Sequence, residues 1–237
     1  MTPPVIPTDR DMVPGAHPSG NDFNWLAKRQ LGNAITIAAR RYARGRLIDI
    51  GCGEKPYQSV FAPYVAAHVG VDHPESPHAL TSVDVLATAY EIPLEDGTFE
   101  TALMSELLEH LETPSRALAE AHRLLAPGGW LIATTPFVWA IHEAPRDFFR
   151  YTPFGLEWMF RQAGFESVDV TPVGGQWSTV GLLASYALRE SRLRRYGDPA
   201  RHLARLAQHV GARLDRRSFK PWMAWNHLAI GRKGEET

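Results

Sequence analysis

From residue 46 onward, hydrophobic and polar positions follow the pattern of alternating strands and helices, with turn residues between them. We predict strands near Arg46–Ile50, Ala67–Asp72, Thr81–Val85, Phe99–Met104, Trp130–Thr135, Ser167–Val173 and Trp225–Gly231. We predict helices near Gln58–Tyr64, Thr113–Leu125 and Pro153–Ala163, the second of them ended by Ala126-Pro127-Gly128-Gly129. Successive strand–helix units of this kind are typical of a doubly wound α/β domain.

Three segments interrupt or precede this alternation. Residues 1–20 hold five prolines and little that a core would bury, so we expect a flexible N-terminal segment. Residues 21–44 have apolar positions at helical intervals that are broken near Gly32, which favours two short helices forming a lid. Residues 178–220 are predicted to be a helical insertion before the last strand. The lid, the insertion and the alternating region together make one domain, residues 21–237.

Composition narrows the class of protein. The 237 residues suit a single doubly wound domain with appendages, since such domains often reach about 200–250 residues. Lys plus Arg total 25 and Asp plus Glu 26, and the resulting net charge of −1 argues against dedicated nucleic-acid binding. The single cysteine, Cys52, excludes an internal disulfide, and no apolar run reaches the ~20 residues of a transmembrane helix. We therefore expect a soluble, cytoplasmic protein, and the oligomeric state stays open.

The segment RLIDIGCGEKPY carries the strongest chemical signal: an apolar strand leading to Asp49, then Gly51 and Gly53. Glycines at these two positions permit positive φ and close approach of a ligand to the backbone. A dinucleotide-binding loop would have a third glycine where this chain has Pro56. The Asp49 carboxylate would repel a diphosphate and attract an ammonium or sulfonium group. These residues therefore predict a cationic cofactor.

Two further acids fall near the ends of the next two predicted strands. Asp72 follows HVGV, where a carboxylate can accept hydrogen bonds from both hydroxyls of a ribose. Asp84, in SVDVLA, can accept from an exocyclic adenine amine. A cation, a ribose and an adenine together describe S-adenosylmethionine.

These residues resemble, in order, the motifs of class I S-adenosylmethionine-dependent methyltransferases. The likeness is carried by the DIGCG loop, by Asp72, by Asp84 with IPLEDGTFETALMSELLEHL, and by LLAPGGWLIATTP, and it covers about residues 45–172 and the last strand. It implies a Rossmann-like, mostly parallel sheet of seven strands, the last antiparallel, with the cofactor across the ends of the first, second and fourth strands. The cofactor contacts it implies are Gly51, Cys52 and Gly53 at the methionine, Asp72 at the ribose, Asp84 and Val85 at the adenine, and Ser105 and Glu106 at the methionine end.

The candidate catalytic residues follow from the reaction. Methyl transfer is a displacement on an activated carbon, so a base matters only if the acceptor must lose a proton. His110 lies after the fourth strand, and His142 with Asp147 lies in a polar, aromatic loop after the fifth. These residues either assist deprotonation or only hold their segments folded. No pair of histidines has ligand spacing on a clear helix face, so no metal is expected.

The acceptor is the least defined part of the prediction. The loop GCGEKPY and the segment HEAPRDFFRYTPFGLEWMFRQAGF are similar to methyltransferases of glycan and secondary-metabolite gene clusters, which favours O-methylation of a small molecule or glycan. Methylation of nitrogen or carbon stays open. Between Arg189 and Arg217 nine arginines accompany three acids, which suits a phosphorylated or RNA acceptor. An NAD-dependent oxidoreductase and a non-catalytic adenosyl-binding module are the remaining alternatives.

Overall fold

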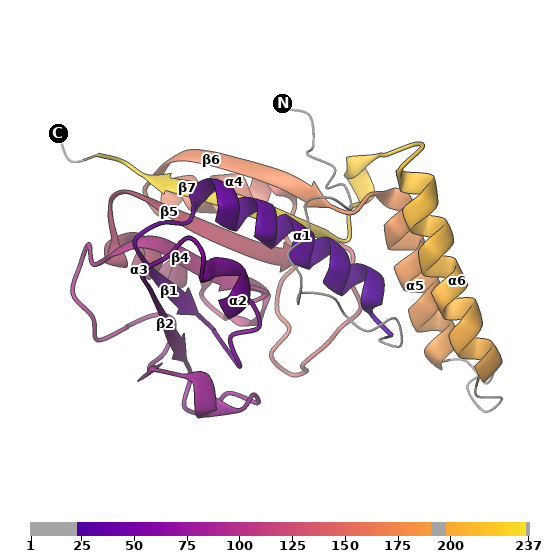
Figure 1. Ribbon diagram of the computed structural model, residues 1–237, viewed down its shortest axis with the longest axis horizontal. Helices are drawn as coiled ribbons and strands as arrows, with labels where there is room; N and C mark the ends of the chain where they lie inside the picture. The colour runs from indigo at the N-terminus through magenta and orange to yellow at the C-terminus, as the bar shows by residue number, and fades with distance from the viewer. Residues whose placement is uncertain (1–22, 191–197, 236–237) are drawn as a thin grey trace.

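The protein is built on one sheet of seven strands in the order β3-β2-β1-β4-β5-β7-β6 (Figure 1). The computed structural model describes residues 23–190 and 198–235, so the expected flexible segment, residues 1–20, lies outside the described residues. The strands are β1 (Arg46–Ile50), β2 (Ala67–Asp72), β3 (Val85–Leu86), β4 (Phe99–Ser105), β5 (Leu125–Pro136), β6 (Phe165–Val173) and β7 (Asn226–Lys233). Neighbouring strands pair in parallel except that β7 is antiparallel to β5 and β6. The doubly wound, Rossmann-like fold with an antiparallel last strand is confirmed.

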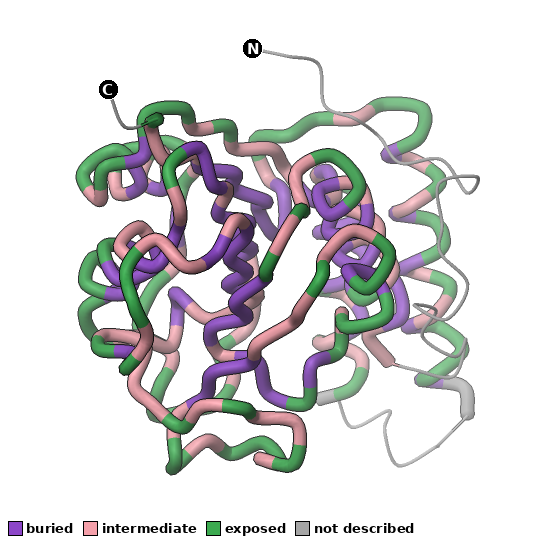
Figure 2. The backbone as a smooth tube through the Cα atoms, turned by 60° about the vertical axis from the view of Figure 1, so that its left-hand side comes forward, coloured by how far each residue is buried: buried purple, intermediate pink, exposed green. Residues whose placement is uncertain are grey.

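Helices cover both faces of the sheet. On one face are α1 (Trp25–Tyr42) and α2 (Gln58–Phe61), and on the other are α3 (Pro114–Leu124) and α4 (Pro153–Gln162) (Figure 1). Side chains alternate across a strand, so Leu47 of β1 packs in the core on the side of α1 and α2, while Ile48 and Ile50 pack in the core on the side of α3 and α4. Figure 2 shows the buried residues concentrated in the strands and the exposed ones in the loops around them.

The prediction of two short helices in residues 21–44 is wrong, because α1 is one continuous helix through Gly32. Leu31, Ile35 and Ala39 lie on one side of α1 and are buried against the sheet. A single glycine inside a helix costs about 1 kcal/mol, which the burial of this apolar face outweighs.

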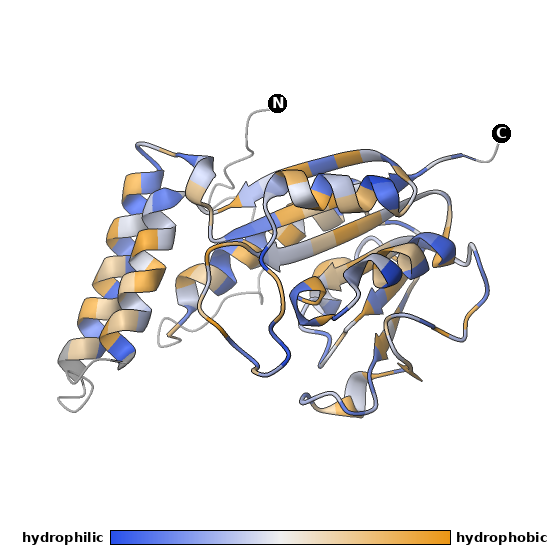
Figure 3. Cartoon of the chain, turned by 180° about the vertical axis from the view of Figure 1, so that it is seen from behind, coloured by the Kyte–Doolittle hydropathy of each residue, from blue (hydrophilic) through white to orange (hydrophobic). Residues whose placement is uncertain are grey.

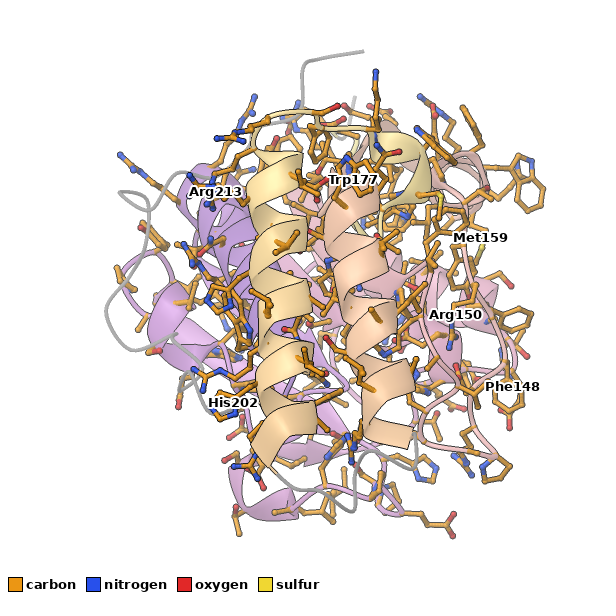
Figure 4. The ribbon with its side chains drawn as sticks, turned by 90° about the vertical axis from the view of Figure 1, so that its right-hand side faces the viewer. Phe148, Arg150, Met159, Trp177, His202 and Arg213 are labelled. Atoms are coloured by element: carbon orange, nitrogen blue, oxygen red, sulfur yellow. The ribbon has the colours of Figure 1, made fainter. Side chains whose placement is uncertain are left out.

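The segment predicted as a helical insertion contains two packed antiparallel helices, α5 (Gln176–Glu190) and α6 (Asp198–Asp215). Figure 4 shows this pair side by side at one end of the molecule, with Trp177 and Arg213 near one end of it and His202 at the other. The outward face of the pair carries exposed apolar side chains, namely Trp177, Val180, Leu183, Leu203, Leu206 and Val210.

Two element boundaries differ from the prediction. Residues Leu80–Ser82 form a 3₁₀ turn and β3 has only two residues, so Asp84 precedes the strand instead of lying inside one. The segment 126–129 does not separate α3 from the next strand, because β5 already begins at Leu125. Gly128, with φ of 71°, lets the chain turn within this strand, and the pairing with β4 shifts register between Phe99 and Thr101.

Within the described residues, no helix combines the length and the apolar character that crossing a membrane requires.

Candidate active site

The carboxyl ends of β1 and β4 meet at the centre of the sheet, where the strand order reverses. Ligands of open α/β sheets bind at such a point. Gly51 follows β1 with φ of 74°, and a Cβ atom there would lie 2.7 Å from Leu107 Cδ1, beyond the end of β4. Glycine therefore allows this backbone path without strain or a shift of Leu107. The amides of Gly51 and Cys52 both donate to the carbonyl of Val71 in β2, at 2.9 and 3.1 Å. These bonds hold the loop against the second strand.

Asp72, the last residue of β2, is joined to this loop. Its Oδ2 accepts a hydrogen bond from the Gly53 amide at 2.7 Å, and its Oδ1 accepts from the His73 amide at 2.7 Å. Each carboxylate oxygen has a second lone pair, so both can still accept from a ligand hydroxyl. The side chain is 9% exposed, which limits competition from water.

Asp84 lies beside the same loop, and its carboxylate already has hydrogen-bond partners within the protein. Its Oδ2 accepts from Lys55 Nζ at 2.5 Å and from the Gly70 amide at 2.7 Å. Desolvation is the largest single effect and raises the pKa of the Asp84 carboxyl, but the Gly70 amide and the Lys55 ammonium together outweigh it, so the pKa is lowered. Lys55 is buried, whereas the Asp84 side chain is half exposed. Val85 begins β3 directly after it, paired with Val71 of β2.

Asp49 is placed differently from the expectation that it closes the first strand. It is the next-to-last residue of β1, it is buried, and its Oδ2 lies 2.9 Å from Nε2 of His68 on β2. Among the described residues, the Nδ1 atom of His68 is buried without a hydrogen-bond partner. Burial raises the pKa of the Asp49 carboxyl, and the bond to His68 opposes this. The Asp49 charge is thus partly compensated within the protein.

Ser105 and Glu106 stand at the end of β4, as the sequence places them. Ser105 Oγ is 3.2 Å from Thr134 Oγ1, and the Glu106 amide donates to the Thr134 carbonyl at 3.0 Å. Glu106 has φ of 52°, and both its carboxylate oxygens accept from Asn226 Nδ2, at 2.8 and 3.0 Å. Burial raises the pKa of the Glu106 carboxyl, and Asn226 opposes the rise. The last strand therefore fixes an acid at the centre of the site.

Cys52 is a buried residue of the loop. Desolvation, followed by the nearby carboxylates, raises the pKa of its thiol to about 12. A thiol that remains protonated at neutral pH is a poor nucleophile. Cys52 therefore contributes a small buried side chain and the backbone hydrogen bond to Val71.

The two candidate histidines are brought together. The rings of His110 and His142 meet edge to face, with centroids 4.8 Å apart. Nδ1 of His110 donates to the Arg146 carbonyl at 2.5 Å, which leaves Nε2 as the acceptor nitrogen. His142 lies in the loop between β5 and α4, which extends beyond the strand ends and is hydrophilic at its tip (Figure 3). Desolvation lowers the pKa of His142.

Glu109 completes this cluster and was missed by the sequence analysis. Its side chain is fully buried, and neither carboxylate oxygen has a hydrogen-bond partner within residues 23–190 and 198–235. Its Oε1 lies 3.7 Å from His110 Nε2. Burial, and then the neighbouring Glu106 carboxylate, raise the pKa of Glu109 well above its usual range. The motif LLEH carried a signal, since a carboxylate next to a candidate histidine is chemically informative.

Asp147 orders the loop that carries His142. Its oxygens accept from Arg150 Nη1 at 2.5 Å and Nη2 at 2.8 Å, and from the His142 amide at 2.9 Å. Nδ1 of His142 is 3.4 Å from Asp147 Oδ2. These contacts, with the Arg150 bonds first, hold the pKa of Asp147 far below its usual range. Asp147 is therefore ionised and positions His142. Figure 4 shows Arg150 and Phe148 along this segment.

A family model described as "Methyltransferase domain" matches residues 26–170 of the chain. The chain belongs to this family. The curated relatives include the ubiquinone biosynthesis O-methyltransferase of Ruegeria pomeroyi (strain ATCC 700808 / DSM 15171 / DSS-3), which is 34% identical over 176 residues, 59% of this chain and 69% of that protein. The chain spans only 36% of the length of an uncharacterized Streptomyces fradiae protein and 52% of several other relatives.

Solved structures agree on the fold of this methyltransferase domain. The crystal structure of the [4+2]-cyclase SpnF has a TM-score of 0.62 at 20% identity, covering 92% of this chain and 86% of that one. A Thermotoga maritima protein titled as a methyltransferase, and as a possible histamine N-methyltransferase, has a TM-score of 0.60 at 19% identity, covering 89% and 93%. At these identities the likeness concerns the fold.

The residues of this methyltransferase domain fit S-adenosylmethionine. A backbone with positive φ at Gly51 and Gly53 provides the close approach that a ligand needs after β1. Asp72 retains lone pairs for ribose hydroxyls, and the partly buried Glu106 carboxyl lies just beyond the end of β4. A cation is favoured in such surroundings, because the carboxyl groups of Asp49, Asp72 and Glu106 lie around this loop and would repel a diphosphate.

Proposed function

We propose that the protein transfers the methyl group of S-adenosylmethionine to a hydroxyl oxygen of a small molecule or glycan. The observation that supports this most is the hydrogen bond from the Gly53 amide to Asp72, because it favours a ribose contact at Asp72 beside a glycine loop within a methyltransferase domain. The relatives named for ubiquinone biosynthesis O-methylation support an oxygen acceptor of low molecular mass.

The cofactor supplies an activated methyl group on a positively charged sulfur. In this proposal the loop at Gly51–Gly53 and Glu106 hold the methionine end, Asp72 holds the ribose, and Asp84 with Val85 borders the adenine. Asp49 lies behind the loop and adds to its negative potential. The protein then needs to align the acceptor with the methyl carbon and to exclude water.

A hydroxyl acceptor is a weak nucleophile, and its proton must leave as the carbon–oxygen bond forms. In the proposal His110 and His142 assist this loss. Their Nε2 atoms are the nitrogens free to act, since Nδ1 of each lies near a backbone carbonyl, that of Arg146 at 2.5 Å and that of Ala140 at 3.3 Å. Asp147 acts through His142 as a positioning residue.

The proposal is tested by screening hydroxyl-containing acceptors with S-adenosylmethionine labelled in its methyl group and detecting labelled product and S-adenosylhomocysteine. We expect label on oxygen, and at least a tenfold lower kcat for His110→Ala and His142→Ala. Full kcat in both variants on the true acceptor would remove the histidines from the mechanism. Calorimetry that shows binding of NAD and none of S-adenosylmethionine or S-adenosylhomocysteine would overturn the assignment as a whole.

A further inference from the structure

The cluster at the end of β4 has the ligand types of a transition-metal site. Glu109, His110 and His142 each offer one ligand atom, and these atoms all lie within 4.8 Å of one another. Two imidazoles and one carboxylate are a common ligand set for first-row divalent ions, whereas Mg²⁺ and Ca²⁺ prefer oxygen alone. Glu143 lies at the rim, with Oε2 3.8 Å from His110 Nε2.

The environment of the Glu109 carboxylate favours a bound ligand. Its carboxylate is fully buried, and among the residues that the structure describes no side chain donates a hydrogen bond to either oxygen. An unsatisfied buried acceptor costs about 1–3 kcal/mol, and more when it is charged. A bound cation would give this carboxylate the charged partner that it lacks among the described side chains.

The orientation of the two imidazoles also suits metal binding. Metal-bound histidines usually donate their second ring N–H to a carbonyl or carboxylate, which fixes the ring and the tautomer. Nδ1 of His110 donates to the Arg146 carbonyl, and Nδ1 of His142 faces the Ala140 carbonyl at 3.3 Å and Asp147 Oδ2 at 3.4 Å. Both rings therefore present Nε2, the nitrogen left to bind an ion.

Binding requires only a small contraction. Ligand atoms about 2.0–2.2 Å from one ion lie roughly 3–3.5 Å apart in tetrahedral geometry. The largest separation between ligand atoms, up to 4.8 Å, must therefore shorten by about 1.3–1.8 Å. His142 can supply this shift, because it lies in a loop and its side chain is 29% exposed. Arg150 is the nearby cation, and its guanidinium is neutralised by two bonds to Asp147.

We propose that Glu109, His110 and His142 bind one divalent first-row transition ion, which holds the acceptor hydroxyl. The role at the acceptor rests on the proposed function. A metal ion lowers the pKa of a bound hydroxyl. The proton leaves to solvent, the oxygen forms a bond to the methyl carbon, and the carbon–sulfur bond breaks with its electron pair going to sulfur. The cation thus promotes a deprotonation that a histidine would otherwise perform. This differs from the expectation, drawn from sequence spacing, that no metal is present.

The test is titration of the full chain with Co²⁺ after dialysis against EDTA, followed by visible absorption and by calorimetry. We expect one Co²⁺ per chain, and at least tenfold weaker binding to Glu109→Gln and His142→Ala. The matched control is His122→Gln, because His122 lies on α3 near the opposite ends of the strands and packs on Phe165. Its affinity should equal that of the unmodified chain.

Absence of Co²⁺ binding, or equal affinity in all variants, would overturn the metal site. If Glu109→Gln does not fold, His142→Ala decides alone, since its side chain is partly exposed on a loop. S-adenosylhomocysteine affinity is measured in the same EDTA-treated sample, where we expect it to be unchanged. If the unmodified chain binds S-adenosylhomocysteine but not Co²⁺, only the metal site is refuted. If the unmodified chain binds Co²⁺ but not S-adenosylhomocysteine, the proposed cofactor is refuted and the metal site stands.

Discussion

Asp72 is the residue whose charge matters most for the proposed cofactor, because it faces the glycine loop and keeps free lone pairs. We expect Asp72→Asn to weaken S-adenosylhomocysteine binding about 10- to 100-fold, since hydrogen bonds to a charged group contribute ~1.5–3 kcal/mol. Calorimetry measures the change. Asp169→Asn, an exposed acid on the distant strand β6, is the matched control and should bind as the unmodified chain does. Equal affinities for both variants would contradict a ribose contact.

His227 links stability to pH. It is buried on β7, and desolvation lowers its pKa to about 4, although a bond to the Tyr151 backbone opposes this. The unfolded chain, with a His pKa of about 6.5, binds more protons between these values, so stability is full above pH ~6.5 and falls as the pH drops toward 4.

We therefore expect the free energy of unfolding, measured in urea, to fall by about 2 kcal/mol more in the unmodified chain than in His227→Asn between pH 7 and pH 4.5. The difference between the two proteins isolates His227, because other titrating groups are common to both. Identical pH profiles would show that His227 protonates as easily in the folded state as in the unfolded one.

At the scale of elements, helix α5 begins on a carboxylate from the end of α6. Asp215 accepts from the amides of Gly175, Trp177 and Ser178, at 3.0, 3.0 and 2.8 Å. An acid at a helix N-terminus satisfies amides that have no partner in the helix and complements the helix dipole. We expect Asp215→Ala to lower the free energy of unfolding by about 2–3 kcal/mol. Arg213→Ala, exposed on the same helix, should change it by under about 0.5 kcal/mol. Chemical denaturation compares the two, and equal losses would contradict the capping role.

Most elements could be predicted because their patterns are local. The bounds of β1 and β2 match the prediction, as apolar runs between turn residues define them. α1 could not be predicted as one helix, because the burial that overrides Gly32 comes from the sheet. β3 has only two residues, and Asp84 is fixed there by Lys55 and the Gly70 amide, contacts that no local pattern shows.

The site shows the same division between local and distant information. Gly51 and Asp72 could be found from their places beside strands. The contact between Asp49 and His68 could not be found in this way, because it depends on the register in which β1 and β2 pair. The contact of His142 with His110 also depends on how a loop folds back over β4. Spacing along the chain therefore could not show that His142 lies beside Glu109 and His110.

At the scale of the whole molecule, the helical pair is joined to both the first helix and the active-site loop. The ring of Tyr186 on α5 lies edge-on to Phe23, with centroids 5.1 Å apart, and to Trp139 of the loop, at 5.3 Å. Trp139 in turn packs on Trp225. The segment expected to act as a lid and the insertion are thus parts of one packed unit that reaches the loop carrying His142.

Gln208 is the polar centre of this unit. Its side chain is fully buried, with Oε1 accepting from the Leu26 amide at 3.2 Å and Nε2 donating to the Phe23 carbonyl at 2.8 Å and to Ser185 Oγ at 3.0 Å. Gln208→Leu keeps the size but leaves these groups unpaired, so we expect a loss of about 2–4 kcal/mol. Hydrogen exchange should accelerate in α5, α6 and the first turn of α1, while the amides of β1 and β4 stay protected, because the sheet core does not depend on this side chain. Gln162→Leu, at the exposed end of α4, is the control. Uniform acceleration across the sheet would instead mean that the helical pair and the sheet unfold as one cooperative unit.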